Sequence, residues 1–286
     1  MRWSHRSKAI QQWSSITLSL TNRVLNLTYG ADEGTDMVVL TANGINVKLD
    51  LSPNFVHYSW HRILYLAPHP LQLPPSNFTI MMLGIGHLVD LFNSVGERRT
   101  SPTNTIEQPD GNTILHIFGS YLFDACSTAP SAHMESQRGC ASAFATLCKV
   151  FCRPQRSAPF LRTYIERFYA ALCVGLKSDA CLPTILLHCT ELFATNLVGV
   201  KMLAPEFISA IKMVLPKLQI DCRGFVSVDD LRLAAIKVVS TIMCLPNHFD
   251  KVELKPGWDW DMQCASDNAS VMGEQEQIVT QLVNVI

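Results

Sequence analysis

The sequence is poor in charge, because only 16% of its 286 residues are Asp, Glu, Lys or Arg, against roughly 25% in a typical globular domain. The 23 basic and 24 acidic residues leave a formal net charge of −1. This balance provides no global attraction to nucleic acid or to an anionic membrane. Hydrophobic residues make up 48% of the chain, which excludes an intrinsically disordered protein. We expect some of this apolar surface to be covered by more chain or by a partner.

Targeting and membrane-spanning segments are also lacking. Three basic residues lie within the first eight, but polar residues interrupt the apolar run that a secretory signal needs. The strongest apolar stretch, residues 80–92, is too short for a membrane span and contains His87 and Asp90. The sequence therefore predicts a cytoplasmic protein without a membrane span.

Cysteine is abundant, with ten residues, but its placement indicates neither a disulfide framework nor a zinc site. Disulfide scaffolds are usually small and poor in core, unlike this chain. Cys148 and Cys152 are four apart and no second close pair supports them. Further cysteines in 173–189 are spaced by eight, near a helical repeat, where cysteine acts as a small buried hydrophobe. His188 precedes Cys189, but adjacent helix residues point in different directions, which disfavours a catalytic thiol.

The apolar pattern along the chain is helical. In residues 9–29 it recurs at threes and fours, as in an amphipathic helix, and Gly30 follows as a stop. Ser52 and Pro53 predict the start of a second helix, with Ser52 as N-cap. Residues 31–51 are predicted to be loop-like. Their only strand-like fragments are 38–40 and 47–51, and the remaining predicted helices are 77–95, 113–126, 141–152, 158–176, 181–194, 205–215 and 227–245, the last ended by Pro246.

These medium-length helices with short connections predict an all-α fold. From residue 137 onward, the spacing approximates two helices per roughly forty residues, which fits a HEAT or armadillo-like α-solenoid of antiparallel helix pairs. We predict a helical segment at 1–95, a polar linker at 96–112 and a solenoid segment at 113–286. An apolar helical pattern restarts near the C-terminus and stops at Ile286 without a polar cap, so we expect a truncated solenoid that lacks terminal caps.

Patterns for catalysis or metal binding are weak. His57 and His61 are four apart on a predicted helix, but Tyr58 stands where a zinc-protease motif has glutamate. Gly84 and Gly86 begin a dinucleotide fingerprint without its third glycine, inside an apolar helix rather than after a strand. We therefore predict no catalytic residue, no metal site and no cofactor.

Two features are candidate interaction or modification sites. Five basic residues crowd one region in which only Glu166 opposes them. The ordinary interpretation of such a cluster is a solvated helix face, and the functional alternative is a docking surface for an acidic partner. In the linker, the sequence Arg-Arg-Thr-Ser-Pro at 98–102 resembles a basophilic kinase site, with Ser101 as the phosphate acceptor. The residues of the basic cluster are Lys149, Arg153, Arg156, Arg162 and Arg167.

Several segments carry a family resemblance. The run Ile-Phe-Gly-Ser-Tyr-Leu-Phe-Asp-Ala at 117–125 corresponds to Leu-Phe-Gly-Ser-Trp-Leu-Phe-Asp-Ala, so Tyr121 replaces a tryptophan. Thr-Leu-Cys-Lys-Val-Phe-Cys at 146–152 corresponds to Thr-Leu-Cys-Arg-Ile-Phe-Cys, and Tyr-Ile-Glu-Arg-Phe-Tyr at 164–169 to Tyr-Leu-Ser-Arg-Phe-Tyr. Together with shorter collinear blocks, these segments resemble the beta-subunit family of the Ral GTPase-activating protein complex. The linker is far shorter than that family's Ser/Pro-rich stretch.

The resemblance implies a helical, non-catalytic scaffold. In that family, the catalytic alpha subunit carries the GTPase-activating domain, and the beta subunit is its partner. The implied function is therefore support of GTPase activation on a Ral-type small GTPase through heterodimerisation with the alpha subunit. No catalytic residue can be carried over, because the matching segments are helix-core residues. Two alternatives remain open, namely an unrelated HEAT-like adaptor in trafficking or transport, and an enzyme that uses cysteine or histidine chemistry.

Overall fold

The computed structural model describes residues 7–29, 37–42, 45–97, 109–127, 133–155, 158–216 and 227–248. The chain divides into two compact units. The first consists of Met1–Thr146 and Gln155–Pro159, and the second of Leu147–Pro154 and Phe160–Ile286. Helix α5 contributes residues to both units.

Helices dominate the described ranges, which confirms the predicted all-α class in its coarse form. In the first unit the elements are α1 (Ser7–Tyr29), β1 (Val38–Ala42), β2 (Ile45–Leu49), α2 (Pro53–Leu64), η2 (Pro70–Gln72), α3 (Pro75–Glu97), α4 (Gly111–Ser127) and most of α5 (Met134–Phe151). The second unit holds the end of α5, α6 (Arg162–Gly175), α7 (Leu182–His188), η3 (Leu192–Ala194), η4 (Val200–Leu203), α8 (Ala204–Val214) and α9 (Val228–His248).

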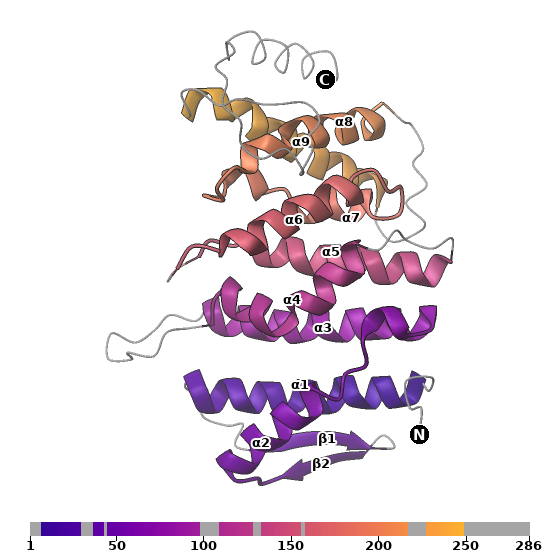
Figure 1. The fold of residues 1–286 in the computed structure, drawn as a ribbon, viewed down its shortest axis with the longest axis vertical. Coiled ribbons are helices and arrows are strands. Elements are labelled where there is room, and N and C mark those ends of the chain that lie inside the picture. The colour runs from indigo at the N-terminus through magenta and orange to yellow at the C-terminus, as the bar shows by residue number, and fades with distance from the viewer. Residues whose placement is uncertain are drawn as a thin grey trace. The chain divides into compact units, whose positions relative to one another are not determined.

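Helix α1 packs against α2 on one side and α3 on the other (Figure 1). Two buried tryptophans hold α2 in place. Trp13 Nε1 donates to the carbonyl of Ile63 at 2.8 Å, and Trp60 Nε1 donates to Thr21 Oγ1 at 2.9 Å. Because a buried indole N–H without an acceptor is costly, these two bonds fix the rotation of α2 about its own axis.

The long apolar helix α3 is the centre of the first unit. Among the described helices, it is the one that is long and apolar enough to cross a membrane, but 67% of that window is buried inside the protein. Phe92 of α3 meets Phe118 of α4 edge to face, with ring centroids 5.8 Å apart. Thr79 Oγ1 donates to the backbone carbonyl of Glu135 on α5. We therefore interpret α3 as a core helix.

The segment between α1 and α2 corrects the loop predicted for residues 31–51. Strands β1 and β2 pair antiparallel, with Val38 opposite Leu49 and Leu40 opposite Val47. Ser19 Oγ of α1 donates to the carbonyl of Val39 at 2.6 Å, and Val38 is buried. The hairpin therefore forms because α1 provides an apolar surface for one strand to cover.

Four helix boundaries also differ from prediction. Helix α6 begins at Arg162 rather than residue 158. Helix α5 begins at Met134 rather than residue 141, because its first turns are polar and show no apolar repeat. The helix predicted at 181–194 is the short α7 followed by the separate 3₁₀ turn η3. Pro246 does not end α9, which runs on to His248. Proline has no N–H to donate to the preceding turn, and the helix continues for only two residues beyond Pro246.

Aromatic rings form much of the core of the second unit. Phe151 of α5 stacks on Phe168 of α6, with centroids 4.0 Å apart, and also meets Phe160 at 4.6 Å. Tyr169 donates its hydroxyl to the carbonyl of Val198 at 2.9 Å. These contacts join the end of α5, α6 and the loop before η4 within one unit.

Several predicted features lie outside the described residues. They are residues 98–108 of the linker, with Ser101 among them, and the C-terminal segment from residue 249. The division at 96–112 and the phosphate acceptor therefore stay predictions.

Candidate functional site

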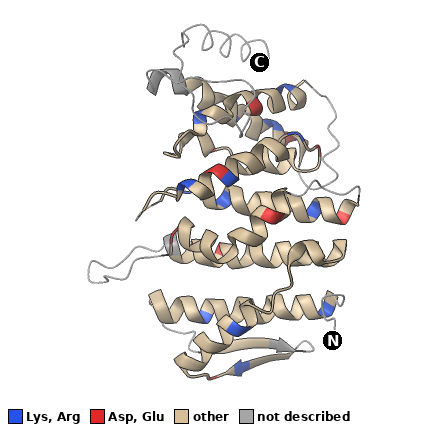
Figure 2. Ribbon diagram, in the orientation of Figure 1, with Lys and Arg blue, Asp and Glu red and all other residues tan. Residues whose placement is uncertain are grey.

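Four members of the predicted basic cluster lie in the second unit. Lys149 occupies the last turn of α5 and Arg153 follows that helix, and both are half-buried. Arg162 and Arg167 are exposed on α6. Figure 2 shows basic residues on both helices, with an acidic residue beside them on α6. Arg156 lies outside the described residues.

An internal ion pair reduces the positive charge of this cluster. Arg162 Nε lies 2.7 Å from Glu166 Oε1, one helical turn away. Arg162 begins α6, and Leu161 before it makes no side-chain cap bond. A cation at this position opposes the helix dipole, so Glu166 compensates for an unfavourable placement. Such an exposed pair contributes about 0.3–0.5 kcal/mol.

The two α6 arginines do not share a face. Arg162 and Arg167 are five residues apart, which separates them by roughly 140° around a helix. A single flat acidic partner cannot meet both side chains in their present directions. The acidic-partner docking surface therefore stays a prediction.

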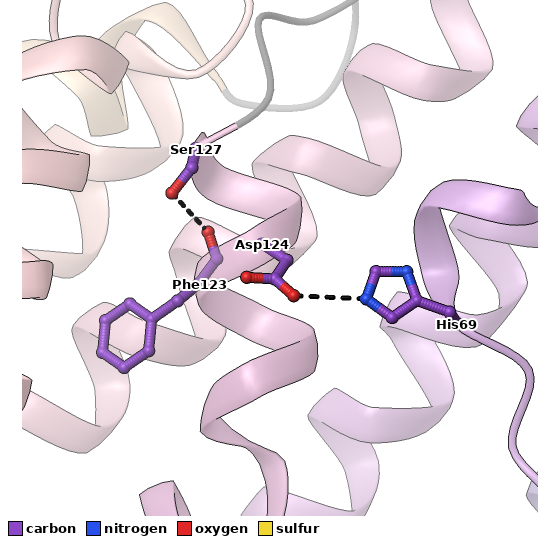
Figure 3. Close-up of polar contacts among 4 residues, drawn as sticks. All are labelled: His69, Phe123, Asp124 and Ser127. Carbon is purple, nitrogen blue, oxygen red and sulfur yellow. Dashed lines mark hydrogen bonds and ion pairs between the residues drawn. The ribbon is translucent and has the colours of Figure 1, made fainter.

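A histidine and a carboxylate meet in the first unit (Figure 3). His69 Nε2 lies 3.2 Å from Asp124 Oδ2, and the two side chains are 41% and 37% exposed. His69 precedes η2 and Asp124 belongs to α4, so the contact ties this connection to a core helix. The ring of Tyr121 lies 6.4 Å from that of His69. Burial, and to a smaller extent Tyr65, raises the pKa of Tyr121.

The geometry around this pair does not resemble a nucleophilic triad. Ser127, one turn after Asp124, donates its hydroxyl to the carbonyl of Phe123 at 2.8 Å. In Figure 3 this hydroxyl is directed to the backbone of its own helix and not to the imidazole of His69. The pair therefore links the segment before η2 to α4 through a polar contact. This contact is an ion pair when His69 is protonated.

Three cysteines come together in the second unit. Cys189 Sγ donates to Cys148 Sγ at 3.3 Å, and Cys152 also hydrogen-bonds Cys189. Burial raises the pKa of both Cys148 and Cys189. These thiols stay protonated at neutral pH, whereas nucleophilic chemistry needs the thiolate. Within the described ranges, no group of three or more His, Cys, Asp or Glu side chains is placed to hold a metal ion.

The outward face of α2 was not predicted from the sequence. Its members are exposed at intervals of three and four residues, opposite the buried Val56 and Trp60. The spacing is visible in the sequence, but it becomes informative only when the buried side of α2 is known. We call this set the α2 face, and it consists of Phe55, Tyr58, His61, Arg62, Tyr65 and Leu66.

Comparison with known proteins gives relatives but no structural template. No protein-family model and no solved structure matches the chain. The chain is 30% identical over 253 residues to a Rap-GAP domain-containing protein of Dictyostelium discoideum, a match that covers 88% of the chain and 14% of that protein. It is 21% identical to Ral GTPase-activating protein subunit beta of Homo sapiens over 407 aligned residues, 88% of the chain and 27% of that protein. The Rattus norvegicus subunit is 20% identical, over 87% of the chain.

These matches confirm the resemblance read from the sequence. The chain is similar to Ral GTPase-activating protein subunit beta over 87–88% of its length. It spans about one seventh to one quarter of the length of these relatives. The human alignment is longer than the chain itself, so the human subunit contains segments within the matched region that this chain lacks.

Proposed function

We propose that this chain is a helical scaffold segment of a GTPase-activating complex. In this proposal it supports hydrolysis of GTP on a Ral-type small GTPase through heterodimerisation with a catalytic alpha subunit. The observation that carries the proposal is the similarity to Ral GTPase-activating protein subunit beta over 87–88% of the chain. The names of these relatives support a role in GTPase activation, and the pairing with an alpha subunit is our inference.

The residues that carry the resemblance have a structural role in this chain. In the 117–125 run, Phe118, Leu122 and Phe123 are buried in α4. In the 146–152 run, Cys148 and Phe151 are buried at the end of α5. Because the matching positions are core positions, what the chain shares with the relatives is helix packing. This supports a scaffold rather than a catalytic role for the segment.

A solenoid arrangement is part of the same proposal. Consecutive α-helices with short connections are typical of stacked antiparallel pairs, which build extended surfaces for protein partners. The exposed α2 face and the basic residues of α5 and α6 are the surfaces that such a scaffold offers. We place the protein in the cytoplasm, because Ral-type GTPases and free buried thiols fit a reducing compartment.

The experiment uses the full-length protein that carries residues 1–286, co-expressed with the catalytic alpha subunit of the same source. We expect the two to co-purify as a stable complex. Clean separation of two folded proteins would contradict the heterodimer. Recovery of coat or cargo proteins in place of the alpha subunit would favour the trafficking adaptor.

One observation supports a second candidate. The Dictyostelium discoideum relative, at 30% identity, is named for a Rap-GAP domain. In this second proposal, the whole protein has a GTPase-activating domain of its own. Single-turnover hydrolysis assays on Rap and on Ral, with and without the alpha subunit, separate the two proposals. Activity on Rap without the alpha subunit favours the second.

A further inference from the structure

The α2 face is an unusual surface for a helix whose orientation is fixed. Tyr65 is 78% exposed, Tyr58 58%, Leu66 57% and Phe55 53%. Phe55, Tyr58, His61 and Arg62 fall within an arc of roughly 120° on one side of α2. Tyr65 and Leu66 directly follow its last turn. Bulky apolar residues exposed singly need no explanation, but a contiguous helical stripe of them indicates an interaction site.

The side chains of the α2 face hold one another in place. Arg62 Nε donates to the hydroxyl of Tyr58 at 3.2 Å, and its guanidinium carbon lies 5.3 Å from the centroid of the Tyr58 ring. The ring of His61 stacks on that of Tyr65, with centroids 6.4 Å apart and planes 13° apart. Side chains that are already ordered lose less entropy when a partner binds. Tyrosine, phenylalanine and arginine are also the residues enriched at the centre of protein interfaces.

The charge of the α2 face indicates the chemistry of the partner that fits it. Helix α2 contains no acidic residue, and among the described residues the guanidinium of Arg62 makes its hydrogen bond and its cation–π contact with Tyr58. By contrast, Arg138, Arg162 and Arg232 each have a carboxylate three or four residues away on their own helix. An unpaired guanidinium next to aromatic rings is suited to a bidentate carboxylate contact from another molecule.

We propose that the α2 face docks an acidic amphipathic helix of a partner protein. The apolar side of the partner helix packs on Phe55, Tyr65 and Leu66 by ridges-into-grooves contact. A glutamate or aspartate on its border pairs with the guanidinium of Arg62. This inference does not require that the partner belong to a GTPase-activating complex.

The test uses two synthetic helical peptides with the same leucine stripe, one bordered by glutamate and the other by lysine. Binding of each labelled peptide to the full-length protein is followed by fluorescence anisotropy at low and at high salt. We expect the glutamate peptide to bind, the lysine peptide to bind at least about tenfold more weakly, and salt to weaken the first complex.

Charge reversal separates this face from the basic cluster. We expect Arg62→Glu to weaken binding of the glutamate peptide by about tenfold or more. Arg162→Glu, which changes a matched exposed arginine on α6, should leave this binding unchanged. Tyr65→Asp is a second variant at a highly exposed position, and it should also weaken binding. Circular dichroism and the melting temperature check that each variant is folded.

Three outcomes would overturn the proposal. One is equal binding of the glutamate and lysine peptides. Another is a loss on Arg162→Glu without a loss on Arg62→Glu, which would place the acidic partner on the basic cluster. The third is a dimer of the protein, seen by light scattering and abolished by Tyr65→Asp, because the occupant would then be a second copy of the chain. Failure of the alpha subunit to co-purify leaves this inference unaffected, so the two proposals fail separately.

Discussion

Substituting Gly139 by alanine tests how closely α5 approaches α3. A Cβ atom at this position would lie 2.4 Å from two carbons of the Phe78 ring, which is buried and has little room to move. Overpacking of this kind costs about 1–3 kcal/mol. Alanine also favours the helix over glycine by about 1 kcal/mol. We therefore expect Gly139→Ala to destabilise the protein by up to about 2 kcal/mol.

Gly119 of α4 provides the matched control. A Cβ atom there would meet Leu115 and Phe123 at 3.6 Å, which is ordinary van der Waals contact. We expect Gly119→Ala to stabilise the protein by about 0.5–1 kcal/mol, because only the helix preference changes. Urea denaturation of both variants, followed by circular dichroism, gives the two free energies of unfolding. If Gly139→Ala were as stable as Gly119→Ala, α3 and α5 would not approach each other as described.

Three further predictions concern the second unit. Alkylating reagents should leave Cys148 and Cys189 unmodified at neutral pH until urea unfolds the chain, and mass spectrometry of native protein labelled at either thiol would contradict their burial. Tyr169→Phe should lower the free energy of unfolding by about 0.5–1.5 kcal/mol through loss of the bond to Val198. Burial raises the pKa of Tyr169. The contribution of Tyr169 to the free energy of unfolding is therefore complete below pH ~10 and is lost above it, because the phenol ionises first in the unfolded chain. Identical free energies of unfolding for the wild type and Tyr169→Phe at every alkaline pH would refute this. Arg162→Ala should change thermal stability by less than about 0.5 kcal/mol, since its ion pair is exposed.

The helical part of the fold could be predicted because most helices are amphipathic. The repeat in 9–29 predicts α1 to within two residues, and Ser52 with Pro53 marks the start of α2. Where the helix surface is polar, as in the first turns of α5, the apolar repeat disappears and the predicted start is too late. Local sequence therefore locates the buried side of a helix better than its ends.

The hairpin could have been predicted from one dipeptide. Asn43-Gly44 separates two runs rich in valine, isoleucine and leucine, and this is a strong signal for a two-residue hairpin turn. The strand-like fragments at 38–40 and 47–51 are each too short to indicate a sheet on their own. Their pairing gives β1 and β2, with Val38 opposite Leu49.

The two candidate interaction surfaces differ in how much of them the sequence alone reveals. The basic cluster is dense in the sequence, yet its arginines at 162 and 167 diverge around α6, and one of them is paired with Glu166. The α2 face has no dense run of one residue type. It is defined by tertiary burial, because Trp60 and Trp13 hold the opposite side of α2 against α1. The divergence of the arginines follows from helical spacing alone, whereas the α2 face can be identified only from the packing of the helices.

The most direct test of the scaffold proposal is GTP hydrolysis on Ral by the catalytic alpha subunit. The rate is measured with the alpha subunit alone, with the full-length protein added, and with the same protein lacking residues 1–286. We predict that the full-length protein raises the rate and co-elutes with the alpha subunit, and that removing residues 1–286 weakens both effects. Equal hydrolysis in all three reactions, with no complex between the folded proteins, would contradict the account.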